Sequence, residues 1–174
     1  MIEKKYTPKK IGVMAIFVSL GIILQYFESR IIITPVPGGK LGLCNIVSII
    51  NIFLFGGCNA IVVSLLRSFL GTILFSSVSA MPYSLVGAFI STLGMFLLKK
   101  FFFPKVSMVG MSVFGAALHN FSQICVAGVI FSSGYIFSYM PVLLVVAVIS
   151  GTATGYAAQI FGNRILKKGE IRHE

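Results

Sequence analysis

A small set of polar side chains stands out in a chain that is otherwise strongly apolar. Arg67 lies near the middle of one apolar run, and His119, Asn120 and Gln123 interrupt another. On a helix, residues spaced three or four apart lie on one face, so these last three side chains are neighbours. Ionisable groups inside a membrane are costly and usually functional. The two features predict a binding site for an anionic or phosphorylated organic molecule.

A glycine-rich loop adds a further polar feature. The segment from Pro37 to Asn45 reads Pro-Gly-Gly-Lys-Leu-Gly-Leu-Cys-Asn and lies between two apolar runs. Glycines let a backbone fold tightly and approach a ligand closely, and Lys40 supplies a positive charge. We expect this loop to cover the site from outside. The alternative is a tight turn whose lysine reaches lipid headgroups.

Tyrosines are predicted at the outer rim, where they either anchor the membrane interface or stack on a flat ring. The expected substrate-binding residues are Lys40, Asn45, Arg67, Tyr83, His119, Asn120, Gln123 and Tyr139. For Arg67, acidic partners are scarce, because the chain has no Asp and its only Glu outside the termini is Glu28. If Glu28 does not reach Arg67, a bound anion becomes the candidate counter-charge. The structural alternative is pairing with helix carbonyls or a neighbouring polar group.

Catalysis finds little support in the motifs. The chain has only two histidines, and one of them, His173, lies in the C-terminal tail, so no zinc ligand set is predicted. The sequence also lacks a Walker motif and a nucleophile elbow. We therefore expect no catalytic residue, no metal and no cofactor, and any ATP-driven step would need another subunit. An intramembrane enzyme that uses His119 is a weaker alternative.

The elements that position these residues must be membrane helices. Hydrophobic residues make up 57% of the 174 residues and charged residues 10%, against about 25% charged in soluble domains. Hydropathy predicts an all-α, polytopic membrane protein of six transmembrane helices in a single domain. The spans are expected at Lys10–Phe27, Leu41–Phe55, Ala60–Phe75, Tyr83–Leu98, Ser107–Phe131 and Tyr139–Leu166. Residues 1–9 would form a basic N-terminus, residues 10–166 the bundle and residues 167–174 a tail.

The placement of basic residues predicts the orientation of the bundle. The net charge is +10, and eleven of the 14 Lys and Arg residues fall at the N-terminus, after the fourth span and at the C-terminus. Six spans put all three clusters on one side, which the positive-inside rule makes cytoplasmic. Only Arg30 and Lys40 fall on the outer side. We expect both termini in the cytoplasm of a bacterial cell, the protein in the cytoplasmic membrane, and no nucleic-acid partner.

Small residues recur every four positions in three of the expected spans. The stripes are Ala15 and Ser19; Ser84, Ala88 and Thr92; and Ala147, Gly151 and Gly155. Helices in lipid pack through such stripes because their backbones can approach closely. Each stripe is therefore expected to serve internal packing, or else to dock a partner membrane protein.

Several motifs together resemble a known family. They are Glu28-Ser29, Pro35 to Pro37, Gly39 to Ile46, Leu65-Leu66-Arg67 with Gly71, Tyr83-Ser84-Leu85 with Gly87, Gly115 through His119-Asn120 to Gln123, and Tyr139-Met140-Pro141 with Gly151. This pattern, which extends over nearly the whole chain, resembles the Gx transporter family, also labelled heptaprenyl diphosphate synthase component I. Cys44 stands where the family pattern favours a small alanine.

The family is similar in architecture to the substrate-binding S-components of energy-coupling factor (ECF) vitamin transporters. This resemblance implies six helices, an outward pocket, and association with a membrane coupling subunit and two ATPases, with Ala15 and Ser19 at the docking stripe. It implies a transport subunit for a molecule such as a flavin, a vitamin or an isoprenoid or quinone precursor. The alternative is a non-transporting accessory of heptaprenyl diphosphate and menaquinone synthesis, or of flavin-based extracellular electron transfer. Such an accessory would hold a prenyl synthase subunit against the basic faces around Lys99–Lys105 and Arg164–Lys168.

Overall fold

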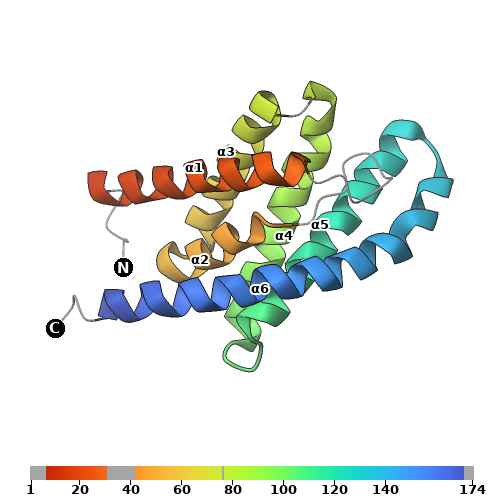
Figure 1. Cartoon of the computed structure of the whole chain (residues 1–174). Helices are drawn as coiled ribbons and strands as arrows, with labels where there is room; N and C mark the ends of the chain where they lie inside the picture. The colour runs from red at the N-terminus through yellow and green to blue at the C-terminus, as the bar shows by residue number, and fades with distance from the viewer. Residues whose placement is uncertain (1–6, 31–41, 76, 171–174) are drawn as a thin grey trace.

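The computed structural model describes residues 7–30, 42–75 and 77–170, and these residues form helices joined by short connections. The elements are α1 (Pro8–Arg30), α2 (Asn45–Phe55), α3 (Gly57–Phe75), the 3₁₀ helix η1 (Val78–Ala80), α4 (Met81–Phe102), α5 (Met108–Phe131), the 3₁₀ helix η2 (Gly134–Tyr139) and α6 (Met140–Glu170) (Figure 1). The described residues contain no strand. The prediction of an all-helical membrane protein is confirmed.

Five stretches of the described chain are long and apolar enough to cross a membrane. They are Pro8–Arg30, Gly57–Phe75, Val78–Phe102, Met108–Phe131 and Gly134–Gly162. The other helix, α2, has 11 residues, so it is about 16 Å long and covers about half of a ~30 Å hydrocarbon core. The expected second span, Leu41–Phe55, is thus a half-length helix in its described part. Helix length alone supports five crossings.

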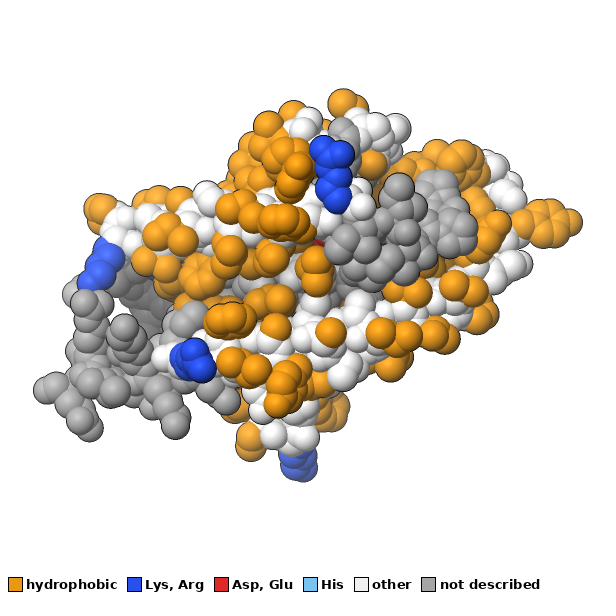
Figure 2. All heavy atoms as spheres, viewed as in Figure 1, with side chains coloured by type: hydrophobic (Ala, Val, Ile, Leu, Met, Phe, Trp, Pro, Cys, Tyr) orange, Lys and Arg blue, Asp and Glu red, His pale blue; other side chains and the backbone are white. Residues whose placement is uncertain are grey.

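The five long helices are neighbours in the order α1, α3, α4, α5, α6, and α2 contacts all five of them. Figure 1 shows α2 between α1 and α6, with the start of α1 and the end of α6 at the same end of the bundle. Figure 2 shows hydrophobic side chains over the exposed faces of α1 and α6, and Lys and Arg side chains toward the ends of the helices. This distribution suits a bundle surrounded by lipid tails, with its charges at the headgroups.

The apolar sequence of α2 explains its central place. Ile49 and Ile52 are fully buried and form a core cluster with Met95 of α4 and Met111 of α5. At the C-terminal end of α2, the Lys99 ammonium donates a hydrogen bond to the Ile52 carbonyl at 3.0 Å. A cation at this end of a helix stabilises carbonyls that lack an intrahelical partner.

The glycine stripe of α6 packs inside the protein. A Cβ atom added to Gly151 would lie 2.6 Å from the Val113 Cα atom, and one added to Gly155 would lie 2.6 Å from the Val109 Cα atom. Only glycine allows α5 and α6 to approach this closely. The internal-packing interpretation of this stripe is therefore confirmed.

The other two stripes have different surroundings. Ser84, Ala88 and Thr92 of α4 are buried against neighbouring helices. On α1, by contrast, Ala15 and Ser19 are exposed, and the Ser19 hydroxyl donates to the Ala15 carbonyl at 3.0 Å. Of the three stripes, only the one on α1 faces away from the bundle.

Candidate functional site

Arg67 lies on α3 in the interior of the bundle and is 4% exposed. Its place depends on Gly21 of α1, because a Cβ atom there would lie 2.5 Å from the Arg67 Cδ atom. The Nη2 group of Arg67 donates to the Ser64 hydroxyl at 3.3 Å, whereas the Nε group is buried without a partner. A buried guanidinium normally has its donors satisfied. Arg67 therefore retains capacity for a further acceptor.

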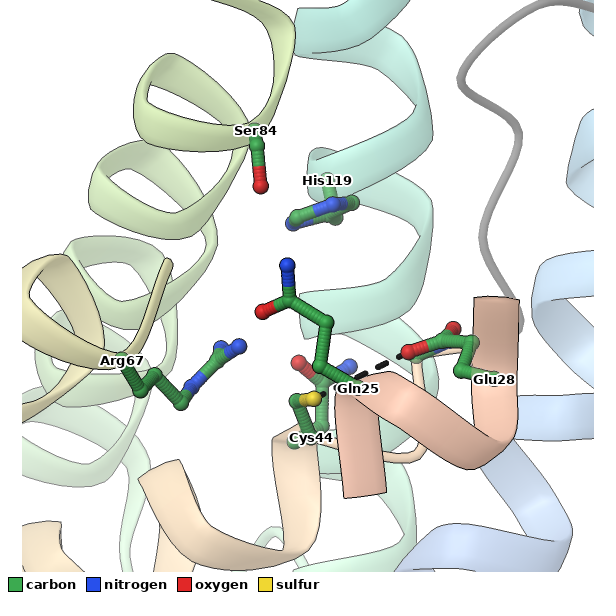
Figure 3. Close-up of a pocket in the computed structure, with 8 residues that line it drawn as sticks. Gln25, Glu28, Cys44, Arg67, Ser84 and His119 are labelled. Atoms are coloured by element: carbon green, nitrogen blue, oxygen red, sulfur yellow. Dashed lines mark hydrogen bonds between the residues drawn. The ribbon is translucent and has the colours of Figure 1, made fainter. Parts of the chain in front are cut away.

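Gln25 of α1 faces Arg67. Figure 3 shows the two side chains pointing toward each other from α1 and α3. Gln25 fills the space left by Gly71, where a Cβ atom would lie 2.7 Å from the Gln25 Cδ atom. Its Nε2 group donates to the Thr72 hydroxyl at 3.4 Å, and its Oε1 atom is buried without a partner.

Asn45 is the first residue of α2 and is 2% exposed. Its Oδ1 atom accepts a hydrogen bond from the Ser91 hydroxyl at 3.5 Å, while its Nδ2 group has no partner. The half-length helix thus begins in the interior of the bundle and presents an amide donor there.

Glu28 holds the segment that leads into α2. One oxygen of its carboxylate accepts the backbone N–H of Gly42, and the other lies 3.7 Å from the Cys44 thiol, whose single S–H also has the Gly21 carbonyl as an acceptor at 3.5 Å. Gly42 has a φ of 79°, a left-handed conformation that favours glycine. Because α2 starts at Asn45, the carboxylate also lies near the positive end of that helix dipole.

The hypothesis that Glu28 neutralises Arg67 can now be assessed. Glu28 bonds to Gly42 and Cys44, and Arg67 bonds to Ser64. The two side chains therefore make no ion pair within the described residues. In Figure 3, the Glu28 carboxylate lies across Gln25 and Cys44 from the guanidinium.

His119 and Ser84 complete the surroundings. His119 of α5 is 7% exposed, and its ring lies against Gly87, where a Cβ atom would be 2.9 Å from the His119 Cε1 atom. Ser84 of α4 shares a 2.7 Å hydrogen bond with Ser68 of α3. Figure 3 shows both side chains, from α4 and α5, on the side to which the Gln25 amide points.

These side chains enclose one cavity between the helices. It is lined by Gln25, Glu28, Gly42, Cys44, Asn45, Arg67, Ser84 and His119. The cavity is narrow, and the space within it accommodates about one water molecule. Three unpartnered polar atoms, on Gln25, Asn45 and Arg67, belong to this lining. Such atoms are uncommon in protein interiors, and each of these three can form a hydrogen bond with a water molecule or a ligand.

The structure brings together part of the predicted site. Asn45, Arg67 and His119 line the cavity. Asn120 and Gln123 do not, although both are buried. The Asn120 amide donates to the Leu143 carbonyl at 3.0 Å and so joins α5 to α6, and both amide atoms of Gln123 lack a partner.

The predicted rim residues lie elsewhere. Tyr83 is half-buried in the first turn of α4, and Tyr139 is 48% exposed at the end of η2. Neither tyrosine lines the cavity. Lys40 and the Gly38–Lys40 part of the loop lie outside the described residues.

Five of the described lining residues were not among the expected substrate-binding residues, namely Gln25, Glu28, Gly42, Cys44 and Ser84. Of these, Gly42 and Cys44 belong to the loop that was expected to cover the site. For α1 a usable signal existed. Gly21, Gln25 and Glu28 are spaced four and three residues apart, so they share one helix face. A small residue followed by two polar ones on the same face marks the side of a membrane helix that faces other helices.

The donor set indicates what the site can do. Among the described residues, no group of three or more His, Cys, Asp or Glu side chains is arranged to hold a metal ion. The groups at the cavity are a guanidinium, two amides, an imidazole, a hydroxyl, a thiol and a carboxylate. A guanidinium with a free donor, in a cavity lined by residues from α1, α2, α3, α4 and α5, is suited to fixing a negatively charged group.

The comparisons with known proteins agree with the helical membrane architecture. No curated protein and no solved structure matches the chain. A family model does match it, over residues 17–161, from within α1 to within α6. The chain therefore belongs to the family described as heptaprenyl diphosphate synthase component I.

Proposed function

We propose that this protein is the membrane-embedded, substrate-binding subunit of a transporter for a small anionic organic molecule. The observation that carries the proposal is Arg67, a buried guanidinium whose Nε group has no partner and which lines an interhelical cavity. A flavin nucleotide, a vitamin with a carboxylate, or an isoprenoid or quinone precursor with a phosphate or carboxylate has the required negative charge. The protein itself would not be an enzyme.

The energetics of Arg67 support a binding role. A charged side chain at the centre of a membrane helix costs about 2.5–3.5 kcal/mol on insertion scales. Glu28, the nearest acidic side chain of the cavity lining, is engaged by Gly42 and Cys44. A bound anion would supply the counter-charge and satisfy the remaining donor. Binding of this anion would then be the functional reason for an incompletely paired arginine inside the bundle.

The size of the cavity indicates that binding involves a rearrangement. Pockets for small molecules usually have a volume of about 300–1,000 Å³. This cavity is much smaller, since it holds about one water molecule. The described state is therefore a closed one. The helices that line the cavity must separate when an organic ligand enters, and this cost lowers the apparent affinity.

The proposed topology has six crossings with both termini in the cytoplasm, as in ECF S-components. The second crossing would be the one that contains α2. Arg30, at the end of α1, then lies on the outer side and Lys105 on the cytoplasmic side. In a cysteine-free background, Arg30→Cys should react with an impermeant thiol reagent added outside intact cells, and Lys105→Cys should not. The reverse pattern would refute the orientation.

The proposed transporter needs partners for energy. The exposed stripe of Ala15 and Ser19 on α1 is our candidate surface for the membrane coupling subunit. Its support is that the stripes on α4 and α6 are used within the bundle. Partner ATPases would bind the coupling subunit.

A binding experiment tests the site directly. The purified protein in lipid nanodiscs is titrated with a panel of flavins, vitamins, quinone precursors and prenyl diphosphates. Arg67→Ala should weaken binding of the ligand by at least about tenfold, equivalent to ~1.4 kcal/mol, since it removes the counter-charge. Arg164→Ala is the matched control, because Arg164 is exposed near the end of α6. Equal binding by both variants would contradict the assignment of Arg67.

A second function is favoured by the family name and by one surface. The name describes a component of a prenyl diphosphate synthase. At the α4–α5 connection, Phe101, Phe102 and Phe103 are exposed beside Lys100 and Lys105, a composition suited to holding a soluble partner at the membrane. Co-purification distinguishes the two functions. A prenyl synthase supports this accessory role, whereas a coupling subunit with ATPases supports transport.

A further inference from the structure

We propose that the group bound by Arg67 is a single carboxylate, so that the substrate is an organic acid rather than a diphosphate. This inference rests on the proposed function and narrows its substrate class. Three features of the cavity support a carboxylate, namely the number of its hydrogen-bond donors, the charges that surround it and its width.

Unpartnered N–H donors line the cavity. Arg67 Nε and Asn45 Nδ2 are buried, unpartnered N–H groups on α3 and α2, and both residues line the cavity. Gln25 on α1 donates through Nε2 to the Thr72 hydroxyl at 3.4 Å, and its unpartnered Oε1 atom is an acceptor. The unpartnered donors at the cavity are therefore the one on α3 and the one on α2.

Two donors from two helices match the two oxygens of one carboxylate. An ionised carboxylate has two oxygens and about four acceptor positions, and a guanidinium edge suits its planar shape. A diphosphate has more oxygens than these groups can satisfy. The unsatisfied oxygens would then lie in the bundle interior, where each loses its hydration without compensation.

The charges of the side chains at the cavity also favour a single carboxylate. Within residues 7–30, 42–75 and 77–170, the cavity lining contains one guanidinium, Arg67, and one carboxylate, Glu28. The Gly42 N–H, the Cys44 thiol and the start of α2 offset the charge of Glu28. The charge of Arg67 then remains for one monoanion. A diphosphate would add surplus negative charge beside Glu28, and like charges in a low-dielectric interior repel strongly.

The narrow cavity also favours the smaller group. A space that holds about one water molecule needs less widening for a carboxylate than for a diphosphate. Packed interiors resist expansion, because helix separation sacrifices contacts.

The test uses two series in which only the headgroup changes. One consists of farnesoic acid, farnesyl diphosphate and farnesol, and the other of 2-naphthoic acid, 2-naphthyl phosphate and 2-naphthol. Their affinities for the full-length protein in nanodiscs are measured together with the panel described above. We expect the carboxylate to bind at least about tenfold more tightly than the phosphorylated compound and the alcohol that share its body.

Two variants examine the cause of this preference. Glu28→Gln keeps an oxygen for the Gly42 N–H but removes the negative charge, so it should narrow the carboxylate preference by about tenfold. Arg67→Met should remove the advantage of the carboxylate over the alcohol. If Glu28→Gln does not fold, the relative affinities of the unmodified protein for the carboxylate, the phosphorylated compound and the alcohol still test the carboxylate assignment.

The outcomes separate the inference from the proposed function. Tighter binding of a phosphorylated compound, either in a series or in the panel, overturns the carboxylate assignment and leaves the proposed function standing. Binding of no compound from the series or the panel overturns the proposed function itself, and the inference with it. A carboxylate preference that persists in Arg67→Met overturns the placement of the carboxylate at Arg67.

Discussion

The Ser112–Thr154 pair between α5 and α6 and the cavity around Arg67 use buried polar groups in opposite ways. Where α5 and α6 meet, the Ser112 and Thr154 hydroxyls share a hydrogen bond of 2.8 Å, and Thr154 also donates to the Ser150 carbonyl at 2.8 Å. At the cavity, Arg67, Gln25 and Asn45 each keep an atom without a partner. The first arrangement joins helices. The second leaves capacity for a ligand at a cost in stability.

Glycines show the same division. Gly151 and Gly155 of α6 lie against the backbone of α5, so they set the distance between two helices. Gly21, Gly71 and Gly87 instead lie against the side chains of Arg67, Gln25 and His119. The second group gives polar side chains the space to reach the interior. A glycine in a membrane helix thus has two distinct roles in this protein, and substitutions can separate them.

The largest effect on stability is expected at the α5–α6 contact. Gly155→Ala places a methyl group 2.6 Å from the Val109 Cα atom, and a backbone cannot move aside as a flexible side chain can. We expect a loss of about 1–3 kcal/mol of unfolding free energy, typical of overpacking. Thermal unfolding in detergent measures it. Gly12→Ala is the control, because a Cβ atom at Gly12 meets no other atom within 4 Å.

At the cavity, an equivalent substitution should affect binding more than stability. In Gly21→Ala the new methyl group lies 2.5 Å from the Arg67 Cδ atom, which can shift because it belongs to a flexible side chain. We expect affinity for the ligand to fall by about tenfold, with a change in stability below about 1 kcal/mol, since alanine also favours the helix. Titration and thermal unfolding of the same samples separate the two quantities. A large loss of stability with unchanged affinity would contradict the proposed role of Gly21.

The smallest effect is expected from a single hydroxyl. Ser112→Ala removes one interhelical hydrogen bond, but Thr154 keeps its bond to the Ser150 carbonyl. Interhelical hydrogen bonds in membrane proteins average about 0.6 kcal/mol, and we expect a loss of that size, with ligand binding unchanged. An effect on affinity would show that the α5–α6 contact and the cavity are coupled.

Much of the architecture follows from the sequence. Apolar runs of spanning length, bounded by clusters of Lys and Arg, predicted the long helices, because lipid requires every backbone group to bond within its own helix. Small residues four apart in the last span predicted a close helix contact, since spacing on a helix is fixed by its geometry. The buried polar character of Arg67 and His119 was also predictable from their position within apolar runs.

The tertiary structure decided the rest. Gly42 and Cys44, which precede α2, meet Glu28 only when α1 packs beside the start of α2. No sequence separation predicts that Gly21 accommodates Arg67 or that Gly87 accommodates His119, because each pair comes from two different helices. The sequence by itself determined that this is a helical membrane protein with polar groups in its interior. Only the packing of five long helices around a short one determined which of those groups have partners, because a hydrogen-bond partner on another helix is set by three-dimensional proximity.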